Sequence, residues 1–119
     1  MSEALMGPGG MFNPVLLWSN TNTTFVAQTV TIRNLTSYKW LVIAYSTVGL
    51  SPIQYMPFLN ISGSKIELAT ATDTNHFRTI TINGDSLNFS DNYYYTTYNS
   101  SVTKVANTHG IPLAIYGVK

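Results

Sequence analysis

The stretch Tyr38-Lys-Trp-Leu-Val-Ile-Ala-Tyr-Ser46 decides the fold of this chain, because it is the longest run of apolar and aromatic residues. Its aromatic and β-branched members favour an extended, pleated backbone. Both alternating sets of its side chains are mostly apolar, which predicts a strand covered on both faces. A helix would scatter the same side chains around its axis instead of collecting them on one side. We therefore predict a central β-strand over residues 38–46.

Shorter strand-like segments, separated by turn signals, occupy the rest of the chain. Asn83-Gly84 is the strongest hairpin signal, because this pair adopts the positive φ values of a type I′ turn. Pro57 restricts its segment to an edge strand or a bulged one. Trp18 and Trp40 are expected in the core. The other expected strands are residues 15–18, 25–32, 53–61, 65–71, 77–82, 87–89, 93–98 and 111–116. This pattern predicts an all-β fold, an antiparallel, jelly-roll-like β-sandwich of eight or nine short strands with no significant helix.

One domain accounts for the 119 residues, a length that supports a hydrophobic core without disulfides. Residues 1–13, which contain a Gly-Pro-Gly-Gly run, are expected to form a flexible N-terminal leader. Residues 14–119 are then the single β-sandwich domain. Its first and last strands are both apolar, so we expect Val15–Trp18 to pair with Ile111–Tyr116 and hide two sheet edges.

The composition is poor in charge: charged residues make up 9% of the chain, the formal net charge is +1, and cysteine is absent. Because a typical domain is about a quarter charged, this chain lacks the basic surface that nucleic acid or an anionic membrane requires. We expect neither partner. Without cysteine, no disulfide or thiolate metal site can form. The polar surface must consist of Thr, Ser, Asn and Tyr, as on extracellular binding domains and virion proteins.

The N-terminus has neither a basic segment nor a long apolar core, so no signal peptide is expected. Apolar runs also stay well below the roughly 18 residues that span a bilayer. We therefore expect the chain to be synthesised in a cytoplasm.

Ionisable side chains are too few and too scattered to predict catalysis. The best carboxylate pair for a glycosidase is Asp85 with Asp91, but both fall in predicted turns, where aspartate caps its own backbone. His76 and His109 lie 33 positions apart, with no acidic residue at a metal-ligand spacing. We predict no enzymatic activity, no metal and no cofactor.

An aromatic cluster in a polar setting is the best candidate ligand-binding site. Tyrosine offers a flat apolar face to a sugar ring and a hydroxyl for hydrogen bonding. The favoured interpretation is that alternate tyrosines fill the core and the others pack against a neighbouring subunit, with saccharide recognition as the alternative. The candidate residues are Asn92, Tyr93, Tyr94, Tyr95, Tyr98 and Asn99.

Met56, Pro57, Phe58 and Leu59 form a second candidate surface, because they lie in a predicted edge strand. Exposed apolar residues at such an edge commonly mark a contact with another protein. We predict an oligomer interface here.

Two blocks of sequence resemble a known class of protein. The first is Leu17-Trp-Ser-Asn20, Phe25-Val-Ala-Gln-Thr-Val30 and Leu35-Thr-Ser-Tyr38; the second is Ile111-Pro112 followed by Ile115-Tyr-Gly-Val-Lys119. Together they resemble small β-rich virion proteins and C-terminal modules of tail-associated proteins in tailed phages of Gram-positive bacteria. The likeness covers about a third of the chain, over residues 16–46 and 111–119.

This resemblance implies a structural or host-adsorption role at the tail, often as a homo-oligomer and without enzymatic activity. The sequence as a whole therefore suggests a non-enzymatic virion protein, a homo-oligomer with a trimer favoured, that contacts other tail proteins. Its expected location is the virion, after synthesis in the host cytoplasm. The alternative is a carbohydrate-binding module that recognises a cell-wall or surface saccharide.

Overall fold

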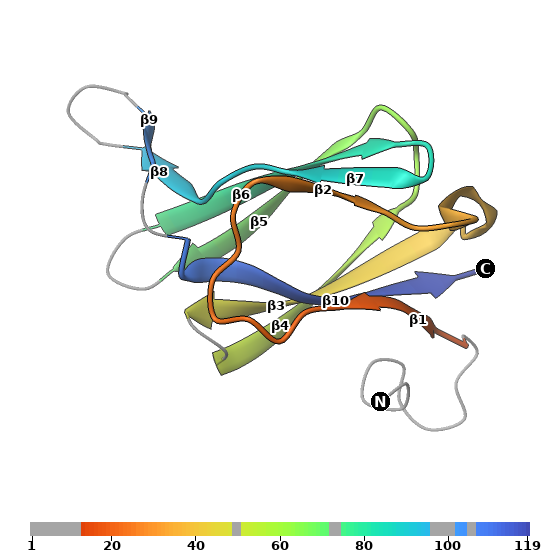
Figure 1. Cartoon of the computed structure of the whole chain (residues 1–119), viewed down its shortest axis with the longest axis horizontal. Coiled ribbons are helices and arrows are strands. Elements are labelled where there is room, and N and C mark those ends of the chain that lie inside the picture. The colour runs from red at the N-terminus through yellow and green to blue at the C-terminus, as the bar shows by residue number, and fades with distance from the viewer. Residues whose placement is uncertain (1–12, 49–50, 72–74, 96–101, 105–106) are drawn as a thin grey trace.

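Two antiparallel β-sheets packed face to face make up this computed structural model, which describes residues 13–48, 51–71, 75–95, 102–104 and 107–119 (Figure 1). One sheet has the order β1-β10-β3-β4; the other has the order β2-β7-β6-β8-β9, with β5 also paired to β6. The strands are β1 Val15–Ser19, β2 Gln28–Thr31, β3 Trp40–Val48, β4 Ser51–Leu59, β5 Lys65–Ala71, β6 Asn75–Asn83, β7 Ser86–Phe89, β8 Tyr93–Tyr95, β9 Val102–Lys104 and β10 His109–Val118. The one helical element of the described residues is a 3₁₀ turn, η1, at Leu35–Ser37. The predicted all-β sandwich is confirmed.

Strand β3 is central, as predicted, because β10 pairs with one of its edges and β4 with the other. Residues 41–47 are all buried. Leu41, Ile43 and Tyr45 point into the core between the sheets. The alternating set that begins at Trp40 lies on the outer face of this sheet. Trp40 itself is exposed there, so its assignment to the core was wrong.

The two ends of the domain meet as predicted. Strand β1 pairs antiparallel with β10, with Leu16 opposite Tyr116 and Trp18 opposite Ile115. Trp18 is half-buried and packs against the core. The pairing covers one edge of β10 but leaves β1 as the outer strand of its sheet.

Strand β4 lies at the opposite edge, where a proline without an N–H is tolerated, so the prediction from Pro57 is confirmed. The β3–β4 pair is longer than the sequence suggested: β3 continues to Val48 and β4 begins at Ser51, beyond the strands expected over residues 38–46 and 53–61.

The second sheet is built on the hairpin of β6 and β7. Asn83 pairs with Ser86 across a two-residue turn, which confirms the predicted hairpin. The turn residues are Gly84, with φ +58°, and Asp85, whereas Asn83 ends β6 without a positive φ, so the predicted type I′ turn over Asn83-Gly84 was wrong. Strand β5 pairs along β6 from Ala71 to Lys65. Strand β9 was not predicted, since the polar stretch in which it lies has no alternating pattern.

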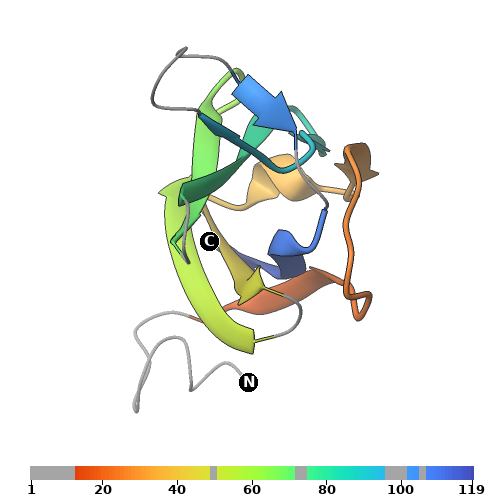
Figure 2. The same cartoon turned by 90° about the vertical axis from the view of Figure 1, so that its left-hand side faces the viewer.

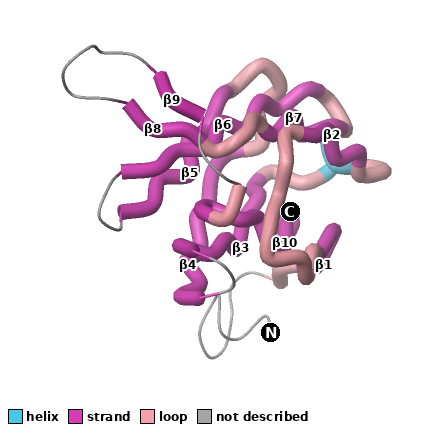
Figure 3. Tube along the Cα trace, turned by 60° about the vertical axis from the view of Figure 1, so that its left-hand side comes forward, coloured by secondary structure: helices cyan, strands magenta, loops and turns pink. Residues whose placement is uncertain are grey.

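Residues 25–27 are not in a strand, although the sequence predicted one over 25–32. Together with residues 20–24 they form the crossing segment, which leaves β1 in one sheet and reaches β2 in the other (Figures 2 and 3). The crossing segment therefore connects the two sheets on the side of the sandwich where β1 and β2 lie.

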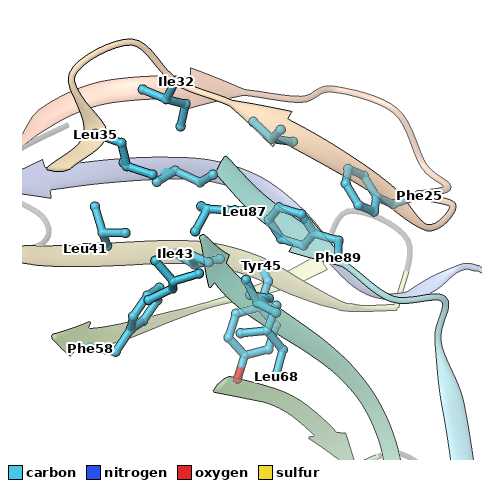
Figure 4. Packing of buried hydrophobic residues seen from close by; sticks show 14 of the residues in the cluster. Phe25, Ile32, Leu35, Leu41, Ile43, Tyr45, Phe58, Leu68, Leu87 and Phe89 are labelled. Atoms are coloured by element: carbon cyan, nitrogen blue, oxygen red, sulfur yellow. The ribbon is translucent and has the colours of Figure 1, made fainter. Parts of the chain in front are cut away.

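The core combines apolar side chains from both sheets (Figure 4). Leu41, Ile43 and Tyr45 come from β3, while Leu87 and Phe89 come from β7 of the facing sheet. Each such side chain contributes about 1.5–3 kcal/mol when it is fully buried. Most of the stability of the fold therefore resides between these layers.

Candidate functional site

The predicted tyrosine site does not form a common aromatic platform in the described residues. Tyr93 and Tyr94 are neighbours in β8, so their side chains point to opposite faces of the strand. The Tyr93 ring lies 5.8 Å from that of Phe77, and its hydroxyl lies 2.7 Å from Glu67 Oε2, to which it donates. The Tyr94 ring instead meets His76 edge-on at 5.8 Å. The two rings therefore cannot stack on one sugar together.

Asn92, the predicted polar partner of these tyrosines, is fully buried. Its Nδ2 donates to the carbonyl of Phe77 at 3.3 Å, and its Oδ1 lies 3.1 Å from His76 Nδ1. This placement contradicts a ligand-contacting role for Asn92. The side chain of Tyr95, together with Tyr98 and Asn99, lies outside the described residues.

Arg78 is the largest fully buried side chain of the described residues, and it organises a polar network beside β8. Its Nε donates to the carbonyl of Gly110 at 2.9 Å, and one terminal nitrogen donates to the carbonyl of Ser90 at 2.7 Å. The other terminal nitrogen reaches the carbonyl of His109 at 3.2 Å and Asn107 Oδ1 at 3.3 Å. The guanidinium therefore joins β6 to the segment around Ser90 and to residues 107–110.

Burial lowers the pKa of Arg78 to about 10, because removal from water disfavours the charged form, and the nearby Asp91 opposes this shift. Arg78 is thus still a cation at neutral pH. Its guanidinium carbon also lies 5.1 Å from the centre of the Phe25 ring, a distance that favours a cation–π contact.

Sequence reasoning missed this network, although part of the signal was present. Arg78 falls in the same alternating set of β6 as Ile80 and Ile82, which are core residues. An arginine on the apolar side of a strand predicts a buried cation with several acceptors. Three of the acceptors are backbone carbonyls and the fourth is the side chain of Asn107, all 12 or more residues away in sequence, so they leave no mark in the pattern.

The two histidines, which lie 33 positions apart in the sequence, stack on each other. Their ring centres are 4.0 Å apart and their planes differ by 13°. His76 is the second residue of β6 and His109 is the first residue of β10. These strands belong to different sheets, so only the packing of the two sheets brings the histidines together. Among the described residues, no three ionisable or thiol side chains gather closely enough to hold a metal ion.

Asp85 and Asp91 lie at opposite ends of β7 and tie distant segments together. Asp85 Oδ1 accepts from the N–H of Thr36 at 3.1 Å. Asp91 Oδ1 accepts from the N–H of Ala27 at 2.7 Å and from Asn107 Nδ2 at 3.2 Å. Both carboxylates therefore hold backbone of other loops, whereas the sequence suggested caps of their own turns.

The predicted oligomer interface divides between the two faces of β4. Phe58 is buried in the core and Met56 packs against it, so neither is available for an interface. Pro57 and Leu59 point outward with the alternate residues of β3. We call the outer side of the β1-β10-β3-β4 sheet the apolar outer face. Its exposed large side chains are Leu16 (56%), Trp40 (37%), Ile53 (49%), Tyr55 (47%) and Leu59 (42%).

A hollow of about 390 Å³ lies beside the crossing segment, and we call it the Trp18 hollow. It was not predicted, because residues 25–32 were expected to form one continuous strand. Its lining is uncharged and combines aromatic with amide and hydroxyl side chains: Trp18, Ser19, Asn20, Asn22, Thr24, Phe25, Val26 and Gln28.

No family model, curated protein or solved structure matches this chain. Among the described residues there is also no helix long and apolar enough to cross a membrane. Three features of the described residues bear on function: the buried network, the apolar outer face and the Trp18 hollow.

Proposed function

We propose that this chain is a non-enzymatic structural protein of a phage virion, that it is associated with the tail, and that it works as a homo-oligomer. The observation that carries the proposal is the apolar outer face. In the proposed assembly, this face is buried against another copy of the chain. The two sequence blocks that resemble tail-associated phage proteins support the virion setting and a role in host adsorption.

The area of the apolar outer face suits a stable protein interface. A fully accessible large side chain presents about 200 Å², so the five exposed residues present roughly 450 Å² at their exposed fractions. A standard interface buries about 800 Å² per partner, of which roughly 60% is apolar. The face therefore supplies nearly all of the apolar area that one such contact requires.

The chemistry of the face favours a copy of the chain over a charged partner. The outward residues of β3 and β4, from Trp40 across to Ile53, carry no charge. Trp40 and Tyr55 are of the types that contribute most binding energy when they are buried at the centre of an interface. An uncharged surface can pack against another copy of the chain without electrostatic repulsion.

Sedimentation velocity of the purified chain over a wide range of concentration tests the assembly. We expect a mass that is a multiple of 13.1 kDa, with a trimer favoured, and we expect Tyr55→Glu to reduce it to the single-chain mass. The matched control is Val26→Glu, because Val26 is at least as exposed as Tyr55 but lies on the crossing segment. A single-chain mass for the unaltered protein at every concentration, or an unchanged mass for Tyr55→Glu, contradicts the proposal.

The virion setting needs a separate measurement. An antibody against the chain should label the tail in electron micrographs of the phage that encodes it. Labelling confined to the capsid, or absent from purified virions, contradicts the tail assignment and leaves the oligomer experiment unaffected.

A further inference from the structure

We propose that the Trp18 hollow binds a neutral saccharide. This inference goes beyond the assembly role, since the residues of the hollow and those of the apolar outer face are different. It also moves the expected sugar site from the tyrosines of β8 to the crossing segment.

The Trp18 ring forms a rigid aromatic floor in the hollow. The Trp18 ring stacks on Phe89 with ring centres 6.3 Å apart and meets Phe25 edge-on at 6.0 Å. Both of these rings are buried, so the indole is fixed while its own surface is only half-buried. Fixing an aromatic ring before the ligand arrives reduces the entropy lost on binding. A rigid indole with accessible surface is a suitable platform for the apolar face of a sugar ring.

Polar side chains surround this aromatic floor. Asn20 is committed to the fold: its Nδ2 donates to the carbonyl of Pro112 at 3.0 Å, and its Oδ1 accepts from the N–H of Asn22 at 3.0 Å. The side chains of Ser19, Asn22 and Thr24, by contrast, have no hydrogen-bond partner among the described residues. Amides and hydroxyls both donate and accept, as the hydroxyls of a sugar require.

Gln28 adds an oriented amide at the start of β2. Its Nε2 donates to the carbonyl of Val26 at 3.2 Å, which fixes the side chain over the crossing segment. The Oε1 atom is left as an acceptor for a ligand, since no residue of the described chain donates to it. Gln28 and Asn22 therefore offer both hydrogen-bond donors and hydrogen-bond acceptors to a ligand on the Trp18 ring.

The lining of the Trp18 hollow carries no charge. Every residue that lines the hollow is uncharged, and phosphate or carboxylate ligands are normally held by arginine, lysine or a helix N-terminus. The volume of about 390 Å³ lies at the small end of the range for ligand sites, which is about 300–1,000 Å³. One or two uncharged sugar rings fit both the chemistry and the size.

Chemical-shift mapping of the ¹⁵N-labelled chain with glucose, galactose, N-acetylglucosamine, cellobiose and chitobiose tests the inference. We expect saturable shifts of the amides of residues 18–28 with at least one of these sugars. Asn22→Ala and Gln28→Ala should each weaken the affinity at least fivefold. Gln54→Ala is the matched control, because Gln54 is an exposed glutamine of β4, away from the hollow, and it should leave the affinity unchanged.

Trp18 fluorescence gives an independent readout. In a Trp40→Phe background, Trp18 is the only tryptophan, so its emission should change along the same binding curve. No saturable change with any of the five sugars overturns the inference. Shifts centred on Tyr93 and Tyr94, or tighter binding of glucuronic acid than of glucose, overturn it as well.

Discussion

Replacement of Arg78 by methionine tests whether the buried network is what holds this end of the sandwich together. Methionine keeps most of the apolar stem of arginine but removes every donor. The carbonyls of Gly110, Ser90 and His109, together with Asn107 Oδ1, then lose a hydrogen bond in a buried or part-buried setting. Each buried acceptor left without a donor costs about 1–3 kcal/mol.

The magnitude follows from the distances and from the cost of burying the charge. Counting the bonds of 2.9 and 2.7 Å in full and those of 3.2 and 3.3 Å at half weight gives a loss of about 6 kcal/mol, at 2 kcal/mol for a full bond. Removal of the cation also removes its desolvation penalty. The fall of its pKa to about 10 is what remains after the opposing effect of Asp91, and it puts the net electrostatic cost of the buried cation at about 3 kcal/mol. The net expected loss is about 3 kcal/mol.

Equilibrium urea unfolding at neutral pH, followed by far-ultraviolet circular dichroism, measures this loss. A loss of about 3 kcal/mol lowers the midpoint by about 1.5 M for a domain of this size. The control is Arg33→Met, because Arg33 is exposed and its replacement should change stability by less than about 0.5 kcal/mol. A loss for Arg78→Met no larger than the control refutes the reasoning.

Arg78→Lys covers the case in which the methionine variant does not fold. Lysine keeps the charge but has one compact ammonium in place of the planar fork, so it can reach only some of the four acceptors. We expect a stability loss of about 2 kcal/mol. Wild-type stability in this variant would show that the charge, and not the fork, is what the site requires.

Three further replacements probe single contacts. Gly117→Ala should cost about 1–3 kcal/mol in thermal unfolding, because a Cβ there would lie 2.5 Å from Tyr38 Cδ1; an unchanged melting temperature would contradict this. Thr70→Val should stabilise the chain to urea by about 1 kcal/mol, since Thr70 Oγ1 is buried without a partner in the described structure; any loss of stability argues against it. Burial raises the pKa of Tyr45 above its usual 10.0, so its neutral form stabilises the fold fully below that pH and progressively less above it. Between pH 9 and 11 the wild type should therefore lose more stability than Tyr45→Phe, and parallel pH profiles would refute the argument.

The architecture was predictable because its determinants are local. An apolar run on both alternating sets can only be a covered strand, and β3 is one. Gly84 marks the turn because glycine readily adopts a positive φ, and Pro57 marks an edge because it lacks a donor. None of these inferences depends on knowing which distant segment lies alongside. The pairing of β1 with β10 was also predictable, since two apolar end strands need cover.

The candidate sites were not predictable in the same way, because distant segments create them. The tyrosine run looked like a platform in sequence, but alternation along β8 sends Tyr93 and Tyr94 to opposite faces. Phe58 looked like part of an exposed edge, yet the same alternation turns it inward beside Leu41 of β3. The Trp18 hollow requires a break at residues 25–27, in a segment whose alternating pattern matches a strand.

The buried network gives a physical reason for that break. The N–H of Phe25 donates to the carbonyl of Asn107 at 3.0 Å, and the N–H of Ala27 donates to Asp91 Oδ1. Asn107 and Asp91 are themselves joined to each other, and Asn107 also accepts from Arg78. The donors that a strand would use for its neighbour are thus taken by the network, and the backbone leaves the sheet.

Arg78 and the Trp18 hollow are therefore coupled through the crossing segment. The Arg78 guanidinium lies over the Phe25 ring, and that ring supports the indole of Trp18 from the side. Loss of the fork in Arg78→Lys should loosen both the backbone and the ring that shape the hollow. A chain with so few charges would then use one buried cation to fix the geometry of an uncharged binding site, and Arg78→Lys should weaken sugar binding although it never touches the ligand.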